Sequence, residues 1–143
     1  MPGLFSKLFS CLANPGLQGW KAIDNRDGTL TPVVSPPTVS VTLLTLVSAV
    51  ATAGVNLGMA AHKHTLQVVV TGAPATGQIQ LEGTLDDATS SGATWAILSG
   101  SQLCTTTTTF HVVDRPVTGI RANLTALTGG TNPTVACKYL GVQ

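Results

Sequence analysis

The sequence predicts an all-β protein, an antiparallel β-sandwich of seven to eight strands, preceded by an N-terminal arm that carries a short helix. Two observations predict this class. From Thr38 onward, apolar and polar residues alternate in short runs, and turn residues separate these runs at regular intervals. The composition, with 43% hydrophobic and 9% charged residues among 143, supplies one domain with a core and excludes ordinary disorder.

The first 37 residues differ from the remainder, because five of the eight prolines fall there. We expect residues 1–37 to form a docking arm and linker, and residues 38–143 to form the sandwich. Apolar residues at helical spacing in the arm predict a short amphipathic helix, which is stable only when docked on its own domain or on a neighbouring subunit. The residues expected to dock are Leu4, Phe5, Leu8, Phe9, Leu12, Trp20 and Ile23.

The arm continues beyond this helix. Trp20 and Ile23 precede the turn signal of residues 25–28, which predicts either a second anchor or a small hairpin. The prolines between Pro32 and Pro37 then predict an extended linker, because proline fixes φ and disfavours a helix before it.

Strands of the sandwich follow in order. Val39 and Val41 alternate with polar neighbours, and the clearest half-buried strand alternates from Ile79 to Leu85. Residues 114–116 predict a turn, and residues 128–133 predict a hairpin whose glycines supply positive φ. The last strand is expected at residues 134–142. The residues expected to share the core face of their strands are Leu66, Val68, Val70, Ile79, Leu81, Gly83, Leu85, Trp95, Ile97, Ile120, Ala122, Leu124 and Ala126. Phe110 and Val112 mark a further strand, which begins in the run Thr105–Thr109.

Charge and hydropathy restrict the partners. Seven basic against six acidic residues exclude the basic patch that nucleic-acid binding needs. The uncharged stretch from Val39 to Ala61 is long enough for a membrane helix, but its threonines, serines and glycines favour strands, so no membrane partner is expected. The N-terminus lacks the apolar run of a signal peptide, so we expect the chain to fold in the cytoplasm. A surface so poor in charge is expected to be covered by partners.

No combination of nucleophile, base and orienting residue predicts catalysis, so no enzyme activity and no cofactor are expected. His62, His64 and His111 are interpreted as surface or loop histidines, with a metal at a subunit axis as the alternative. Glu82, Asp86, Asp87 and Asp114 are interpreted as solvated loop carboxylates rather than a calcium site. Cys104 and Cys137 are expected to be buried thiols, although a bridge between neighbouring strands is the alternative.

The loop after the Ile79–Leu85 strand, with Asp86, Asp87 and Trp95, is a candidate binding surface. Core packing beside Ile97 is the expected role of Trp95, and a sugar-stacking platform is the alternative. The uncharged run Thr105–Thr109 suits an exposed strand. Because charge normally blocks unwanted pairing at a sheet edge, this run is expected to be covered by a partner.

Four segments resemble small virion proteins of tailed bacteriophages: Val68–Gly72, Ile79–Asp86, Trp95–Leu98 and Ile120–Thr131. The loop from Asp86 to Thr94 is longer here than in that family, where it carries Asp-Gly. The resemblance implies a jelly-roll-like sandwich attached to the phage particle.

The function expected from this resemblance is that of a non-enzymatic capsid decoration, or cement, protein at the virion surface. It would bind the major capsid protein and sister copies, as a homotrimer or dimer, through its arm and uncharged faces. The alternative is a tail or head fibre adhesin that binds host surface glycan through its loops.

Overall fold

The computed structural model describes residues 20–24 and 30–143. The chain divides into two compact units, Met1–Pro36 and Pro37–Gln143. In the first unit, β1 (Trp20–Asp24) pairs antiparallel with β2 (Leu30–Val34), which confirms the predicted hairpin. The predicted linker at Pro32–Pro37 is too long, because Pro32 pairs with Ala22 inside β2. Proline is tolerated there because each strand of a two-stranded sheet is an edge.

The second unit is all-β in its described residues and holds seven strands. Their bounds are β3 (Thr38–Val47), β4 (Ala51–Thr71), β5 (Thr76–Thr84), β6 (Ala96–Ile97), β7 (Gln102–Leu103), β8 (Thr108–Thr128) and β9 (Thr134–Val142). All the pairings are antiparallel. Between residues 37 and 143 no helix is long and apolar enough to cross a membrane.

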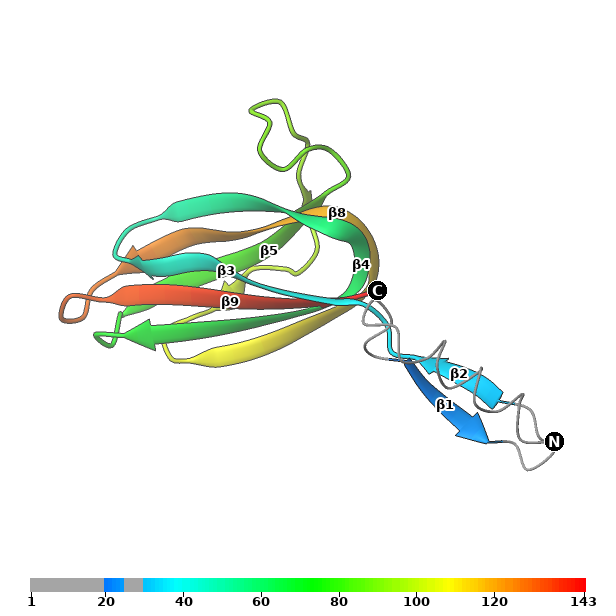
Figure 1. Ribbon diagram of the computed structural model, residues 1–143. Coiled ribbons are helices and arrows are strands. Elements are labelled where there is room, and N and C mark those ends of the chain that lie inside the picture. Colours follow the sequence, from blue (N-terminus) through cyan, green and yellow to red (C-terminus); the bar gives the residue numbers. More distant parts are fainter. Residues whose placement is uncertain (1–19, 25–29) are drawn as a thin grey trace, which may run out of the picture. The chain divides into compact units, whose positions relative to one another are not determined.

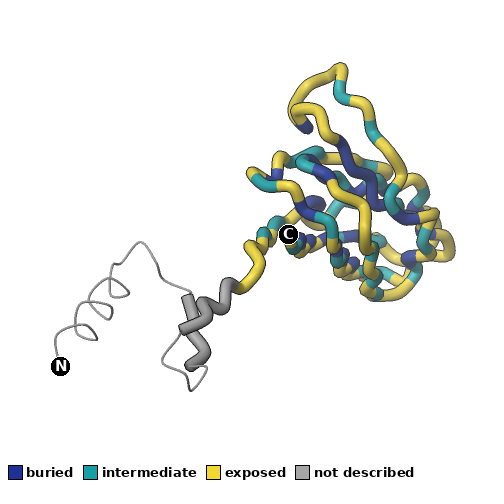
Figure 2. Tube along the Cα trace, turned by 90° about the vertical axis from the view of Figure 1, so that its right-hand side faces the viewer, coloured by how far each residue is buried: buried dark blue, intermediate teal, exposed yellow. Residues whose placement is uncertain are grey.

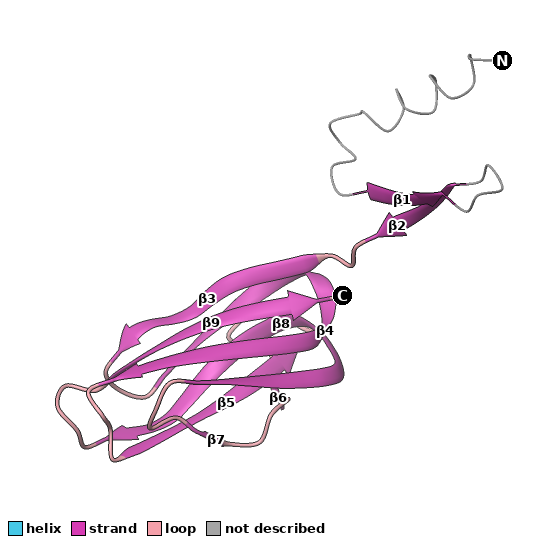
Figure 3. Cartoon of the chain, turned by 90° about the horizontal axis from the view of Figure 1, so that it is seen from below, coloured by secondary structure: helices cyan, strands magenta, loops and turns pink. Residues whose placement is uncertain are grey.

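Two long strands, β4 and β8, each bend and pass from one layer of the sandwich to the other (Figure 1). Sheet I contains β3, β9, residues 63–71 of β4 and residues 108–113 of β8, in that order. Sheet II contains residues 51–56 of β4, residues 119–128 of β8, then β5, with β6 and β7 beside β5. This order in two facing sheets is that of a jelly roll, which confirms the predicted fold class (Figure 3).

The bend corrects one sequence prediction. Residues 114–116 are not a turn between two strands but part of the continuous strand β8. Asp114 adopts a left-handed backbone with φ 60°, which aspartate tolerates better than most residues. In β4, register shifts between Asn56 and Lys63, together with Gly58 at φ 69°, bend the chain at the same end.

The core lies between the two sheets, where buried residues alternate with exposed ones along the strands (Figure 2). Its largest fully buried apolar side chains include Leu66, Ile79, Leu81, Ile120, Leu124 and Tyr139. The inward faces predicted for β4, β5 and β8 are therefore confirmed there. Leu85 is one exception, with 74% of its surface exposed, because β5 ends at Thr84. Ala126 is another: it is only half-buried and Leu127 is buried instead, because the register of β5 with β8 shifts between Gln78 and Ile79. The hairpin at residues 128–133 is confirmed, with Gly129 and Gly130 at positive φ.

Candidate functional site

A loop of residues 85–95 leaves the end of β5 and rises above the sandwich (Figure 1). Its ends are held together, because the Asp86 carboxylate accepts a hydrogen bond of 2.7 Å from the backbone N–H of Thr94. The Asp86 N–H donates to the hydroxyl of Thr84 at 3.0 Å. Backbone bonds from Ser90 to Asp87 and from Ala93 to Ser90 fold the loop tip. The loop thus satisfies many of its own polar groups.

Asn56 of β4 pins this loop to sheet II. Its Nδ2 donates to Asp87 Oδ1 at 2.7 Å, and its Oδ1 accepts from the Ala88 N–H at 2.8 Å. The amide of Asn56 and the N–H and hydroxyl of Thr89 lower the pKa of Asp87 to about 2 by bonding to its charged form. Asp87 is exposed, but its carboxylate is occupied by partners within the protein.

Two glycines make room for the loop on the sheet surface. A Cβ atom on Gly54 would lie 2.6 Å from the Ala88 carbonyl oxygen and 2.9 Å from the Trp95 ring. A Cβ atom on Gly119 would lie 2.7 Å from the Ala88 side chain. Glycine inside a strand often marks such a close approach, so these residues carried a signal that the sequence analysis did not use.

Trp95 contacts a polar cluster formed by Glu82, Arg121 and Asn123 on sheet II. The Arg121 guanidinium stacks over its ring, with Cζ 4.3 Å from the ring centroid. Arg121 Nε donates to Glu82 Oε2 at 2.5 Å, and Asn123 Nδ2 donates to Glu82 Oε1 at 2.8 Å. The prediction of core packing beside Ile97 is wrong, because Ile97 is 58% exposed and Trp95 is half-buried under Arg121. The interpretation of Glu82 as a solvated loop carboxylate is wrong too, since it is buried within β5.

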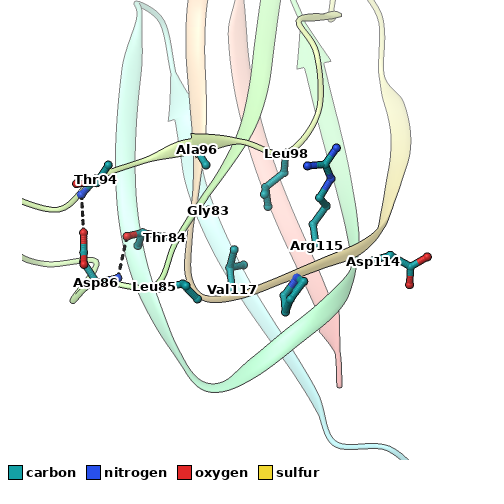
Figure 4. A pocket seen from close by; sticks show the side chains of 11 residues that line it. Gly83, Thr84, Leu85, Asp86, Thr94, Ala96, Leu98, Asp114, Arg115 and Val117 are labelled. Atoms are coloured by element: carbon teal, nitrogen blue, oxygen red, sulfur yellow. Dashed lines mark hydrogen bonds between the residues drawn. The ribbon is translucent and has the colours of Figure 1, made fainter.

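A cleft of about 580 Å³ opens beside the loop, at the end where β8 bends (Figure 4). Leu98 and Val117 supply apolar side chains to it, while Arg115 extends towards Leu98 and Asp114 points outward. The lining residues are Gly83, Thr84, Leu85, Asp86, Thr94, Ala96, Leu98, Asp114, Arg115, Pro116 and Val117. The arrangement can receive a polar ligand between a carboxylate and a guanidinium, with an apolar floor.

The structure brings the three predicted loop residues into one loop without uniting them in one site. Asp86 lines the cleft, Asp87 is occupied by Asn56, and Trp95 is covered by Arg121. Arg115 was missed, because residues 114–116 were interpreted only as a turn. The arm residues Leu4, Phe5, Leu8, Phe9 and Leu12 lie outside the described residues, as do the side chains of Trp20 and Ile23.

The three histidines do not meet. His64 is buried, with Nδ1 2.7 Å from the Tyr139 hydroxyl and Nε2 2.8 Å from the Arg115 carbonyl oxygen, so it is not a surface histidine. His111 Nδ1 lies 2.9 Å from the hydroxyl of Thr65. Among the described residues, no three His, Cys, Asp or Glu side chains are grouped as metal ligands.

The cysteines of the second unit, Cys104 and Cys137, are free and buried. The prediction of buried thiols is therefore confirmed, and the alternative of a disulfide between them is not. Burial raises the pKa of both thiols, that of Cys137 to about 12 with a further contribution from the neighbouring Cys104. Both are therefore protonated and unreactive at neutral pH.

No protein-family model matches the chain, and no curated protein matches it in sequence. Among solved structures, it is similar to the SPBc2 prophage-derived protein YomS, with a TM-score of 0.53 and 15% identity over 78% of this chain and 97% of YomS. It is also similar to the PBSX exported protein XepA, with a TM-score of 0.55 and 20% identity over 85% of this chain and 44% of XepA. The chain thus spans less than half of XepA. These similarities confirm, at the level of the fold, the resemblance to small β-sandwich proteins of bacteriophages.

Proposed function

We propose that this chain is a non-enzymatic structural protein of a bacteriophage particle, and that it decorates the assembled head. The observation that carries this proposal is the surface of the sandwich. Eight large apolar side chains are exposed on it: Leu46, Val50, Val69, Leu85, Ile97, Leu103, Val113 and Leu140. Residues 37–143 contain only eight charged residues: Lys63, Glu82, Asp86, Asp87, Asp114, Arg115, Arg121 and Lys138.

A surface this poor in charge is unfavourable for a dispersed monomer, whose solubility normally depends on interspersed charges. Burial against neighbouring subunits removes the apolar side chains from water and gives the domain a reason to bind an assembled surface. A protein that binds only the assembled shell stabilises the shell by mass action. The fold shared with two prophage proteins supports this setting.

In this proposal the first unit is the anchor. Residues Leu4, Phe5, Leu8, Phe9, Leu12, Trp20 and Ile23 would dock on the major capsid protein, and the sandwich would lie at the particle surface beside sister copies. Deleting residues 1–36 should abolish incorporation into heads and leave a folded sandwich, because residues 37–143 enclose their own core. Incorporation is measured by mixing purified protein with undecorated heads, followed by sedimentation and mass spectrometry.

A second test adds two negative charges to the anchor, either on its apolar residues or, as the matched control, on neighbouring polar residues. Phe5→Asp with Phe9→Asp should abolish incorporation, whereas Ser6→Asp with Ser10→Asp adds the same charge at positions outside the apolar pattern and should preserve most of it. Full decoration by the truncated protein would refute the anchor. A copy number of a few chains per particle, rather than many set by the symmetry of the shell, would refute the decoration role.

The cleft of Figure 4 favours a second candidate, a tail or head fibre adhesin that binds host surface glycan. Hydroxyl-rich ligands suit the polar groups of Asp86, Thr94 and Arg115. If this candidate is correct, the protein binds members of a glycan array, and Arg115→Ala weakens that binding at least tenfold. Lys138→Ala, an exposed cation outside this cleft, should leave it unchanged. Trp95→Ala is a poor test, because it also removes the packing that holds the loop.

A further inference from the structure

The edge strand β3 leaves one side of sheet I open. Within residues 37–143, β3 pairs with β9 and with no other strand, so its far side offers free backbone groups. Natural proteins protect such edges with charges, prolines or bulges. The segment Thr38–Thr42 contains none of these, since its sequence is Thr-Val-Ser-Val-Thr and its register with β9 is regular.

The free backbone groups belong to alternate residues. The Gln143 N–H donates to the Pro37 carbonyl at 3.0 Å, so Pro37 and Gln143 form a hydrogen-bonded pair. In an antiparallel ladder such pairs recur at every second residue, which directs the backbone of Val39 and Val41 towards β9. The N–H and C=O groups of Thr38, Ser40 and Thr42 therefore point away from the sheet, and the three side chains are exposed.

We propose that two copies of this chain pair through Thr38–Thr42, antiparallel about a two-fold axis at Ser40. Thr38 then lies opposite Thr42 of the second copy, and Ser40 lies opposite Ser40. Each facing pair exchanges two backbone hydrogen bonds, because all three residues carry outward groups. The facing side chains are Thr–Thr, Ser–Ser and Thr–Thr, which are favourable cross-strand pairs. The result is one continuous sheet across both copies.

Charge and chain flanks fit this register. The nearest charged residue is Lys138, which lies opposite Thr42 on β9. Two copies of Lys138 are separated by three strand spacings, roughly 14 Å, and by four residues along the strands, roughly 13 Å, so they lie about 20 Å apart, beyond the screening length of about 8 Å in physiological salt. Pro36 and Pro37 lack N–H donors at one end of the segment, and register shifts after Thr42 limit the other end. The pairing length is therefore fixed at these five residues.

The other open edge of sheet I, residues 108–113 of β8, suits self-pairing less well. A two-fold axis at His111, the centre of residues 109–113, would place Thr109 opposite Val113, so that a polar side chain faces an apolar one at both ends of the contact. The contact through Thr38–Thr42 of β3 is smaller than a stable protein interface, so the two copies pair weakly in dilute solution. The pair is populated when anchors bound side by side on the particle raise the effective concentration of the sandwiches. The inference rests in that respect on the proposed function.

Disulfide trapping of the full-length chain tests the register. In a Cys11→Ser background, Ser40→Cys should form a disulfide-linked dimer at once on mild oxidation, because paired Cα atoms lie about 5.5 Å apart and disulfides span about 4.4–6.8 Å. Thr38→Cys and Thr42→Cys should each remain monomeric alone, since their own copies lie roughly 13 Å apart, and should cross-link when mixed. Cys104 and Cys137 are buried and do not interfere.

Thr109→Cys is the matched control, because Thr109 is also exposed but lies on the other open edge, and this variant should remain monomeric. Adding Ser40→Lys to the mixed Thr38→Cys and Thr42→Cys pair should lower its cross-linked yield at least tenfold, because two ammonium groups then face each other. Equal yields for all four cysteine variants would overturn the inference, and cross-linking of Thr109→Cys with Ser40→Cys would replace it with head-to-tail pairing. Ser40→Lys also separates this inference from the proposed function. Because residue 40 lies outside the anchor, the variant should still bind heads although the pairing between copies is lost.

Discussion

Replacing Leu81 by alanine should lower the free energy of unfolding by about 2–5 kcal/mol, whereas the same change at Leu85 should alter it by less than about 0.5 kcal/mol. Leu81 is fully buried on β5, between the two sheets, and truncation leaves a cavity there. Leu85 lies past the end of β5 and is 74% exposed. Urea denaturation monitored by circular dichroism measures both differences in unfolding free energy, provided that the dependence of this free energy on urea concentration (the m-value) is the same for all variants.

Substitutions at these two leucines distinguish the prediction made from sequence alternation from the prediction made from the structure. Simple alternation from Ile79 to Leu85 places both residues on the core face, so it predicts two large losses of stability. The structure predicts one. A loss above about 2 kcal/mol for Leu85→Ala would show that the strand continues inward past Thr84. A small loss for Leu81→Ala would place the core elsewhere.

Alternation predicted the face of each strand because a side chain in a strand has only two directions to choose between. Ile79, Leu81, Ile120 and Leu124 were assigned to the core on this ground, and all four are buried. Alternation does not determine where a strand ends or bends. Whether residues 114–116 reverse the chain or continue it depends on strands that are distant in sequence, and here β4 bends beside them.

The candidate site was less predictable, because its contacts join residues far apart in the chain. Glu82 and Arg121 lie 39 residues apart, and Asn56 holds an aspartate 31 residues away. No local period marks such pairs. The acidic loop was predicted from its composition, while its attachment depends on space left by Gly54 and Gly119. The glycine positions in these strands are therefore the local signal that a loop approaches closely.

Acidification should destabilise the sandwich through His64. Burial is the main cause that lowers the pKa of His64 below its ordinary value of 6.5, opposed by its bond to the Arg115 carbonyl and assisted by the nearby His62. A histidine that releases its proton more readily when folded binds fewer protons in the native state than in the unfolded state. Its stabilising contribution is present above about pH 6.5 and is lost as pH falls towards the folded pKa.

The expected slope is at most about 1.4 kcal/mol per pH unit, the value for a difference of one bound proton. Denaturant midpoints should therefore change little between pH 7.5 and pH 6.5 and should fall as the pH is lowered from 6.5 to 5. Asp87 does not contribute in this window, because its stabilisation is lost only below its ordinary pKa of 3.8, as pH approaches about 2. The two groups can thus be separated by the pH at which each acts.

Two variants assign the slope to His64. His64→Gln should be less stable than the native chain at pH 7.5 by about 1–3 kcal/mol, because the buried Tyr139 hydroxyl loses its partner, and its midpoints should change little down to pH 5. Tyr139→Phe removes the same hydrogen bond but keeps the buried imidazole, so its slope should persist. If both variants keep the dependence of stability on pH, a group other than His64 causes it. If both lose it, the Tyr139 hydroxyl rather than burial is the main cause of the lowered pKa of His64.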